Sequence, residues 1–190
     1  MMHPTEQRLK LPHRIEDILL LRSFEPSDVN ALADLEYDPE VKKFIGIPKR
    51  DKADWITNSL IKLQTFDSFA IITLPELVFA GRASLSRRHL DPTKLGFNLD
   101  ETKKRELEIV IAKAFWGRKF GRALASFLIP MAFKDFAAAA VTGTVHPENK
   151  ASLKLLLDWN FSCVGKNLDR TSPQFNFLVY ELSAAIAQKI

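Results

Sequence analysis

Cysteine is nearly absent from this chain of 190 residues, which contains only Cys163. One thiol cannot form an intramolecular disulfide, and it offers no spacing for a metal site. We therefore expect no disulfide and no bound metal, as is typical of a cytoplasmic protein. Cys163 itself is predicted to be a small buried residue of a strand.

Long hydrophobic runs are also missing. The apolar stretch at 127–133 is interrupted by Pro130, well before the ~18 residues that cross a bilayer. Residues 1–14 mix proline, acidic and basic residues and lack the apolar centre of a secretion signal. We expect no membrane association, a cytoplasmic location, and a single domain over residues 1–190 with a flexible or loosely attached segment at 1–14.

Neither sign of charge dominates, since 27 basic residues stand against 23 acidic ones and give a net charge of +4. The basic runs at 87–88 and 103–105 could contact nucleic acid, but a solvated basic face is the simpler interpretation. Nucleic-acid binding is kept as an alternative that predicts an affinity falling steeply with salt.

Two nucleotide-binding patterns are absent as well. A dinucleotide fold needs G-x-G-x-x-G after a strand, and a P-loop needs G-x-x-x-x-G-K-[ST]. Neither pattern occurs among the 7 glycines of the chain. Hydride transfer and phosphoryl transfer are therefore not expected.

What the chain does contain is an alternation of apolar runs and breakers that predicts one mixed α/β domain with about seven strands and about four helices. Strands are predicted at 18–24, 69–74, 77–85, 106–112, 139–145, 160–164 and 175–182. A helix is predicted to begin after Pro26 and to stop before Pro39, with further helical segments at 41–44, 51–63, 115–136 and 149–157.

A basic, glycine-containing turn at 111–124 joins a buried strand to the long helix. The first N–H groups of a helix lack internal partners, and the helix dipole adds partial positive charge there. A pyrophosphate would be stabilised at such a place. The candidate anion-binding residues are Gly117, Arg118, Lys119, Phe120, Gly121 and Arg122.

Two segments carry a family resemblance. The sequence FWGRKFGRAL at 115–124, followed by VHPENKASLKLLLDWNF at 145–161, resembles the two acetyl-CoA-binding motifs of the GNAT superfamily of N-acetyltransferases. The opening segment 18–46 is similar to the RimJ/RimL-type branch, the ribosomal-protein N-terminal acetyltransferases and their relatives. The resemblance implies a mixed, mostly antiparallel sheet that is splayed between two central strands and holds acetyl-CoA in the opening.

The resemblance also implies which residues bind acetyl-CoA. Besides the basic turn, these are Val110, Ile111 and Ala112 of the strand, and Asn149 and Ser152 of the second motif. Asn149 is equally explained as the N-cap of the following helix, and both roles can hold together.

Besides Trp116, which stands in place of Gln or Arg as is common in the RimJ/RimL-like branch, three positions depart from the family's pattern. Lys119 stands where a glycine is usual, and a left-handed conformation there would cost about 1–2 kcal/mol. Asn160 replaces the glycine of an L-G-F pattern but tolerates positive φ. Leu156 stands where many members have a tyrosine that protonates the departing thiolate. Ser152 is then a candidate for that role, or a structural residue at the third position of its helix.

For the general base, the resemblance implies Glu108. Strand alternation places Glu106, Glu108 and Val110 on one face, and we expect apolar neighbours to raise the pKa of Glu108. An ordinary polar strand residue is the alternative interpretation, and Glu106 is the reserve candidate. Backbone N–H groups at 111–113 are expected to stabilise the oxyanion. His146, at a strand end, is expected to be structural.

The hypothesis is therefore an acetyl-CoA-dependent N-acetyltransferase whose acceptor is an N-terminal α-amine of a protein or peptide. At pH 7 an α-amine is roughly ten per cent neutral, and a lysine is less than about a tenth of a per cent neutral. One alternative is a small-molecule amine acceptor. Another is a non-catalytic acyl-CoA-binding regulatory module, suggested by Lys119 and Leu156. Exposed members of the 14 phenylalanines could support a homodimer.

Overall fold

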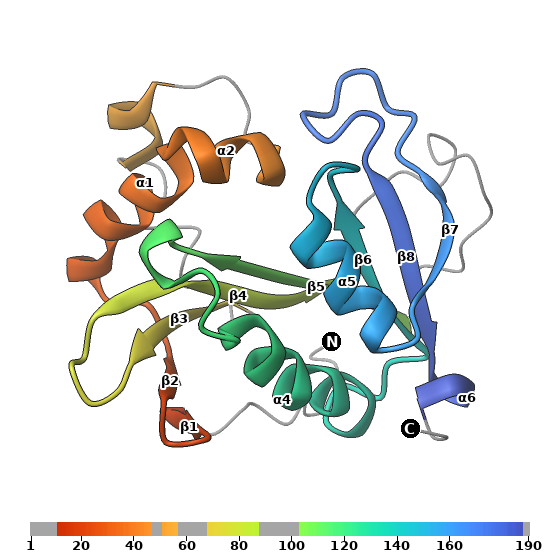
Figure 1. The fold of residues 1–190 in the computed structure, drawn as a ribbon, viewed down its shortest axis with the longest axis horizontal. Coiled ribbons are helices and arrows are strands. Elements are labelled where there is room, and N and C mark those ends of the chain that lie inside the picture. The colour runs from red at the N-terminus through yellow and green to blue at the C-terminus, as the bar shows by residue number, and fades with distance from the viewer. Residues whose placement is uncertain (1–10, 47–50, 57–67, 88–102, 188–190) are drawn as a thin grey trace, which may run out of the picture.

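The structure is a computed structural model, and it describes residues 11–46, 51–56, 68–87 and 103–187 (Figure 1). Eight strands form one sheet in the order β1-β2-β3-β4-β5-β6-β8-β7, and β5 and β6 are the one parallel pair among these described strands. The strands are β1 (His13–Ile15), β2 (Leu19–Arg22), β3 (Ser68–Thr73), β4 (Phe79–Arg87), β5 (Lys104–Ile111), β6 (Ala140–Val145), β7 (Ser162–Lys166) and β8 (Leu178–Ser183).

Helices cover both faces of this sheet (Figure 1). They are η1 (Pro26–Asp28), α1 (Val29–Tyr37), α2 (Pro39–Ile45), η4 (Lys113–Phe115), α4 (Phe120–Lys134), α5 (Lys150–Asp158) and α6 (Ala184–Ala187). Leu107 and Ile109 of β5 pack in the main core with α4 and α5, whereas Val110 packs with α1 and α2. The predicted division of β5 into two faces is confirmed. Among the described helices, none is both long and apolar enough to cross a membrane.

The sheet opens between its two central strands. The ladder between β5 and β6 joins Lys104, Arg105 and Glu106 to residues 140–142 and ends there. β5 continues to Ile111 and β6 to Val145, so the two strands run on beyond the last paired residues. Strands β1 to β5 form what we call the N-terminal arm, and β6 to β8 form the C-terminal arm. The expected splayed sheet is thus confirmed.

A second contact joins the two arms at α2. Gln174, between β7 and β8, donates from Nε2 to the carbonyl oxygen of Ile45 at 3.2 Å. Gly46 follows with φ +64°, and a side chain there would meet Gln174 Cγ at 2.6 Å, so glycine fits this position. The ring of His146 extends the contact. Its centroid lies 5.8 Å from that of Phe44 and 5.0 Å from that of Phe177. We call this whole set of contacts the strap.

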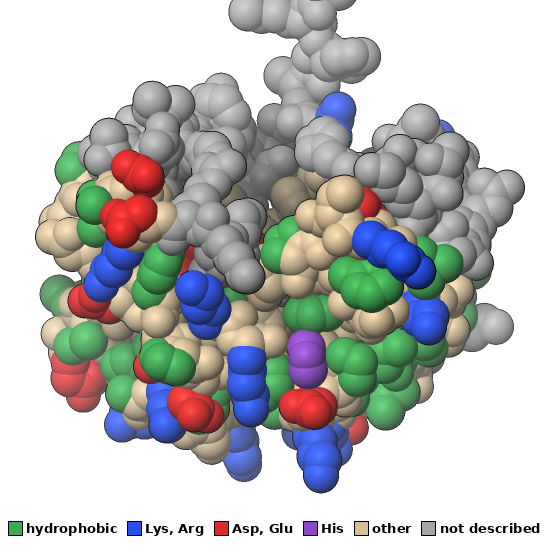
Figure 2. All heavy atoms as spheres, turned by 90° about the horizontal axis from the view of Figure 1, so that it is seen from above, with side chains coloured by type: hydrophobic (Ala, Val, Ile, Leu, Met, Phe, Trp, Pro, Cys, Tyr) green, Lys and Arg blue, Asp and Glu red, His purple; other side chains and the backbone are tan. Residues whose placement is uncertain are grey.

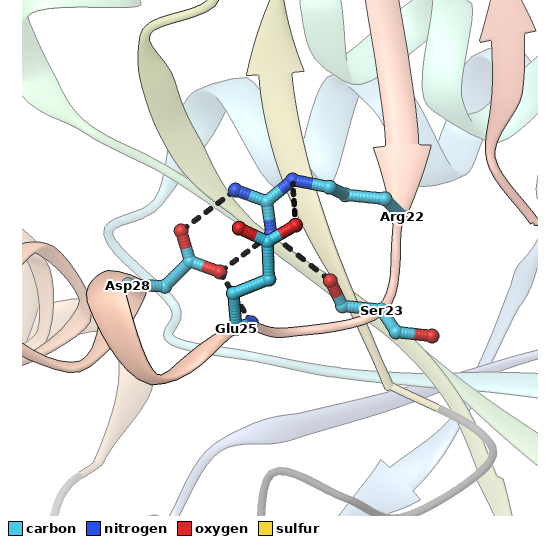
Figure 3. Close-up of polar contacts among 4 residues, drawn as sticks. All are labelled: Arg22, Ser23, Glu25 and Asp28. Carbon is cyan, nitrogen blue, oxygen red and sulfur yellow. Dashed lines mark hydrogen bonds and ion pairs between the residues drawn. The ribbon is translucent and has the colours of Figure 1, made fainter.

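An ion pair fixes the turn from β2 into α1 (Figure 3). Arg22 donates to both carboxylate oxygens of the buried Asp28, at 2.6 and 2.8 Å, and the backbone N–H of Glu25 donates to the same carboxylate at 2.8 Å. Burial acts to raise the pKa of Asp28, but the hydrogen bonds from Arg22 and Glu25 outweigh it and hold the pKa below its usual range. The pair thus closes the short turn η1 that leads into α1.

All seven predicted strands occur, with ends shifted by a few residues. β1 is additional, and it pairs with β2 through a turn at Glu16 and Asp17, which have positive φ. The long helix starts at Phe120 rather than at 115, because residues 116–119 form the turn before it. Of the helix predicted at 51–63, residues 52–56 are helical, and the remainder lies outside the described residues. The same holds for His89 and most of the polar stretch that follows it.

The prediction that Cys163 is buried is wrong, because its side chain is exposed. β7 is the last strand of the sheet, and a register shift between Cys163 and Gly165 interrupts its pairing with β8. An edge strand with a bulge covers its side chains less than a central strand does.

In the basic run at 103–105, Lys103 is exposed as expected, but Lys104 and Arg105 do not belong to a solvated face. Arg105 is buried with its guanidinium 4.5 Å from the centre of the Phe136 ring, and Lys104 donates to Glu181 at 2.6 Å. On the face shown in Figure 2, basic and acidic side chains are interspersed. Lys104 and Arg105, being engaged inside the protein, do not form a nucleic-acid-binding surface.

Candidate active site

The backbone of β5 presents polar groups to the opening between the arms. Ala112 donates its N–H to the carbonyl oxygen of Ala80 at 2.8 Å, so the even-numbered residues of β5 direct their backbone groups toward β4. The odd-numbered residues direct theirs toward β6, from which β5 diverges after Glu106. The N–H groups of Ile109 and Ile111 therefore face the opening, where an extended ligand could pair with them.

The strand residues expected to contact acetyl-CoA differ in what they can offer. Val110 directs its backbone toward β4 and buries its side chain against α1 and α2. The N–H of Ala112 is engaged with β4. Ile111 keeps its N–H on the side of the opening, while its carbonyl oxygen accepts from Nε1 of Trp116 at 2.8 Å. Of these residues, Ile111 is thus the one whose N–H faces the opening.

The turn between β5 and α4 contains two residues in the left-handed region. Gly117 has φ +79°, and Lys119 has φ +63° and ψ +11°. The left-handed conformation considered for Lys119 from the sequence is confirmed, and its side chain costs about 1–2 kcal/mol there. Turns of this kind, placed before a helix, bring successive backbone N–H groups together in a concave, anion-binding arrangement.

α4 begins directly after this turn. The N–H of Arg122 donates to the carbonyl oxygen of Lys119 at 3.0 Å, whereas Phe120 and Gly121 come before the first bonds of the helix. The side chains of Arg118, Lys119 and Arg122 are exposed around the same end of the helix. N–H groups, helix dipole and basic side chains therefore gather at one place, and this set fits a pyrophosphate.

The second motif lies against the first through α5. Oδ1 of Asn149 accepts the backbone N–H of Ser152 at 3.1 Å, which confirms the capping interpretation. A Cβ atom added to Gly121 would lie 3.6 Å from Cδ2 of Leu155, so α4 and α5 approach each other closely at this glycine. The two motifs, separated along the chain, are thus neighbours in the fold.

Leu156 is a packing residue. Its side chain is buried, and its Cδ2 would lie 3.1 Å from a Cβ atom added to Gly143 on β6. The contact secures α5 to the C-terminal arm and supplies no proton donor where many family members have a tyrosine. At the end of α5, Asn160 has φ +57°, so the turn survives without the family's glycine.

Three charged side chains from three elements meet on the face of the sheet that carries α1. Arg82 of β4 donates from Nε to Oε1 of Glu36 on α1 at 2.7 Å. Its two terminal nitrogens bind both oxygens of Glu108 on β5, with Nη2 to Oε1 at 2.9 Å. The side chains of Glu36, Arg82 and Glu108 are 10%, 17% and 36% exposed, so Glu108 is the end that solvent reaches. We call these three residues the triad.

The expectation of a raised pKa at Glu108 is wrong. Burial acts to raise it, but the charge and the hydrogen bonds of Arg82 outweigh burial and lower the pKa of Glu108 below its usual range. At Glu36 burial prevails and raises the pKa; the charge of Arg82 opposes it, and the charge of Glu108 adds to it. No local sequence pattern points to this arrangement, because Arg82 lies 26 residues from Glu108 and 46 residues from Glu36.

The remaining candidates have structural partners. Oε1 of Glu106 accepts a hydrogen bond from Oγ1 of Thr144 at 2.6 Å, across the point where β5 and β6 separate. Nδ1 of His146 accepts the N–H of Glu148 at 3.2 Å, and its ring belongs to the strap. Glu106 holds the base of the opening and His146 its far end, which is the structural role expected for the histidine.

Comparisons with known proteins support the architecture. A family model described as an acetyltransferase (GNAT) domain matches residues 19–161. Among curated proteins, none matches the sequence. Many solved structures share the fold, and their identities to this chain are low.

An acetyltransferase of the GNAT family from Bacillus anthracis matches with a TM-score of 0.70 at 18% identity, over 90% of this chain and 96% of that one. RimJ from Mycobacterium smegmatis, in complex with CoA-disulfide, has a TM-score of 0.66 at 13% identity, over 92% and 89%. The spermidine N-acetyltransferase from Vibrio cholerae, in complex with CoA and spermine, has a TM-score of 0.67 at 14% identity, over 91% and 99%. The structural likeness shows the fold, and because the family model spans most of the sequence, this chain belongs to the GNAT family of acetyltransferases.

Proposed function

We propose that this protein transfers the acetyl group of acetyl-CoA to the N-terminal α-amine of a protein or peptide. Membership of the GNAT family supports acetyl transfer to an amine. The choice of acceptor rests on one observation, the two-pronged ion pair between Arg82 and Glu108.

That ion pair makes Glu108 a weak base, since it lowers the pKa of the carboxyl group. An α-ammonium has a pKa of about 7.7–8.0 and a lysine ammonium one of about 10.4. Taking the proton from an α-ammonium is therefore easier by about 3.5 kcal/mol for the same carboxylate. An acceptor that is already partly neutral at pH 7 suits this site better than lysine does.

On the donor side, we place the pyrophosphate of acetyl-CoA at the start of α4 and the pantetheine arm along the open edge of β5. The N–H of Ile111 is then the donor to the developing oxyanion. The amine nitrogen attacks the thioester carbonyl carbon, the carbon–sulfur bond breaks, and the amine's proton passes to Glu108 directly or through water. The thiolate takes a proton from Ser152 or from water, because Leu156 has none to give.

The test uses matched peptides that carry a free or blocked N-terminus, with or without a lysine. Thiol release and mass spectrometry should show acetylation of the free α-amine. Glu108→Gln should lower kcat/KM by about 10² to 10⁴-fold, because a positioned base contributes that much. Binding of acetyl-CoA, measured by calorimetry, should persist in this variant.

Glu106→Gln is the matched control on the same face of β5, and we expect it to lose far less activity than Glu108→Gln. The opposite ranking would transfer the role of base to Glu106. Product at lysine, with none at the α-amine, would overturn the proposed acceptor.

Two other candidate functions are tested by the same assay. A polyamine panel tests a small-molecule acceptor, which deserves inclusion because a spermidine N-acetyltransferase has this fold. A non-catalytic acyl-CoA-binding module, suggested by Leu156 and Lys119, predicts binding of acetyl-CoA without product on any amine.

The exposed thiol of Cys163 fits the reducing cytoplasm that the sequence predicts as the location.

A further inference from the structure

The triad divides one guanidinium between two carboxylates. Arg82 uses its Nε for Glu36 and its terminal nitrogens for Glu108. A guanidinium is planar and rigid, so its position at one carboxylate fixes its position at the other. With both carboxylates ionised, the triad carries one net negative charge, and two of its three side chains are largely withdrawn from solvent.

The three members come from elements with different tasks. Glu36 belongs to α1, close to its end at Tyr37, and Arg82 and Glu108 belong to adjacent strands of the N-terminal arm. Glu108 alone among the three reaches solvent to a substantial degree. Glu36 thus stands behind Arg82 and does not reach the exposed end of the triad itself.

We propose that Glu36 is a positioning residue for the transfer reaction, because it shares Arg82 with Glu108 and thereby sets the orientation of that carboxylate and its readiness to accept a proton. The inference rests on the proposed function, in which Glu108 takes the proton of the amine. Through Glu36, helix α1 would thus help to orient the general base, although none of the residues proposed to bind acetyl-CoA lies on α1.

The electrostatic part of the inference has a definite sign. Among the described residues, the groups that shift the pKa of Glu36 are Arg82, Glu108 and, through a hydrogen bond, the indole of Trp55. Arg82 is the charged group that lowers the pKa of Glu108. Like charges favour protonation of each other, and Arg82 disfavours it for both. Because the pKa of Glu36 is raised and that of Glu108 is lowered, Glu36 takes up its proton first as pH falls. Once Glu36 is neutral, Arg82 holds Glu108 ionised more strongly and makes it a weaker base.

Glu36→Gln tests this, because glutamine keeps the shape and can still accept from Arg82. In the unmodified protein, kcat/KM should fall about twofold to threefold as Glu36 takes up its proton and should fall further when Glu108 does. Glu36→Gln should start at the lower level and lack the first fall. Arg82→Lys should move the final fall to higher pH, since lysine cannot form the fork that holds Glu108 ionised. These two changes in the profile are not expected from mere loss of stability.

Glu181→Gln is the matched control. It removes a carboxylate from another ion pair of the sheet, the one with Lys104, and should keep both falls in the pH profile. A profile for Glu36→Gln that superimposes on the unmodified protein, or that matches the control, would overturn the inference.

A second readout does not depend on turnover. Carboxyl carbon NMR, with the Glu108 signal assigned through Glu108→Gln, follows the proton uptake of this side chain directly. In the unmodified protein this signal should respond first as Glu36 takes up its proton and again as Glu108 does, and Glu36→Gln should lack the first response. A first response that persists in Glu36→Gln would refute the coupling. If the first response is lost while Glu108→Gln keeps full activity, Glu108 is not the base and Glu36 has no part in the reaction. Absence of acetylated product from the unmodified protein would instead count against the proposed function.

Discussion

Lys119 is the residue of the proposed cofactor site at which the backbone favours glycine while the bound phosphate would favour a positive charge. Its φ of +63° lies in the region that glycine occupies at least cost. Its side chain is exposed beside the start of α4, where basic groups would meet phosphate oxygens. We infer that the strain is offset when the ammonium group contacts a phosphate of the bound cofactor.

Replacing this lysine with glycine separates the two effects. Lys119→Gly should raise the free energy of unfolding by up to about 1 kcal/mol, because the left-handed strain is removed while the flexibility of glycine offsets part of the gain. It should also weaken acetyl-CoA binding by about threefold to tenfold, equivalent to about 0.7–1.4 kcal/mol. Thermal unfolding and titration calorimetry measure the two quantities.

Two variants serve as controls for this experiment. Asn160→Gly relieves a positive φ of +57° at the end of α5 and should leave the affinity for acetyl-CoA unchanged. Lys119→Ala removes the charge without relieving the backbone, so it should weaken binding and gain no stability. Full affinity in Lys119→Gly would show that Lys119 makes no phosphate contact.

At the start of α5, Asn149 could stabilise the helix, contact the cofactor, or do both. Asn149 caps α5 through the N–H of Ser152. Asn149→Ala should cost about 1 kcal/mol of stability, and Asn149→Ser should restore most of it, because serine is also a good N-cap. We expect the affinity for acetyl-CoA to follow the same order, measured by calorimetry beside thermal unfolding. A serine variant that is stable but binds acetyl-CoA weakly would show that the amide of Asn149 contacts the pantetheine arm.

Strands and turns could be predicted from the sequence because their signals are local. The alternation in β5 separated Val110 from Leu107 and Ile109 correctly, since side chains alternate along any strand. β1 has too few residues for such a pattern. The prediction of a buried Cys163 fails because the sequence does not reveal which strand lies at the edge of a sheet.

In the candidate site too, the features that depend on neighbouring residues could be predicted, and the one that depends on distant residues could not. The left-handed turn at Lys119 and the cap at Asn149 depend on neighbouring residues, and both expectations agree with the structure. The pKa of Glu108 depends on Arg82, which β-sheet pairing brings to it, and on the helix that carries Glu36. Glu108 has apolar neighbours in the sequence, but in the fold it forms an ion pair with Arg82. Its pKa is therefore lowered and not raised as the sequence predicts.

Stability of the whole molecule should depend on pH through Asp28. Its folded pKa lies below the unfolded value of about 3.9. Its contribution is therefore complete above that value and is lost as pH falls through the folded pKa. Asp28→Asn should cost about 2–3 kcal/mol at pH 7, less than a fully buried pair because Arg22 keeps some contact with water. The difference from the unmodified protein should shrink in acid, as measured by denaturant unfolding at several pH values.

Glu25→Gln is the control for this series. Its carboxylate lies 3.6 Å from Nε of the same Arg22 but is 59% exposed, so its loss should change stability little. A destabilisation by Asp28→Asn that stays constant into acid would contradict the assignment of this pH dependence to Asp28.

The strap gives the molecule a mechanical property that the sheet alone would lack. A sheet that splits at its middle is joined at the ladder that ends at Glu106 and could spread beyond it. Here Gln174 is bonded to Ile45 and the ring of His146 lies against Phe44. Separation of the two arms would break these contacts, so the strap opposes widening of the opening at the end away from the ladder.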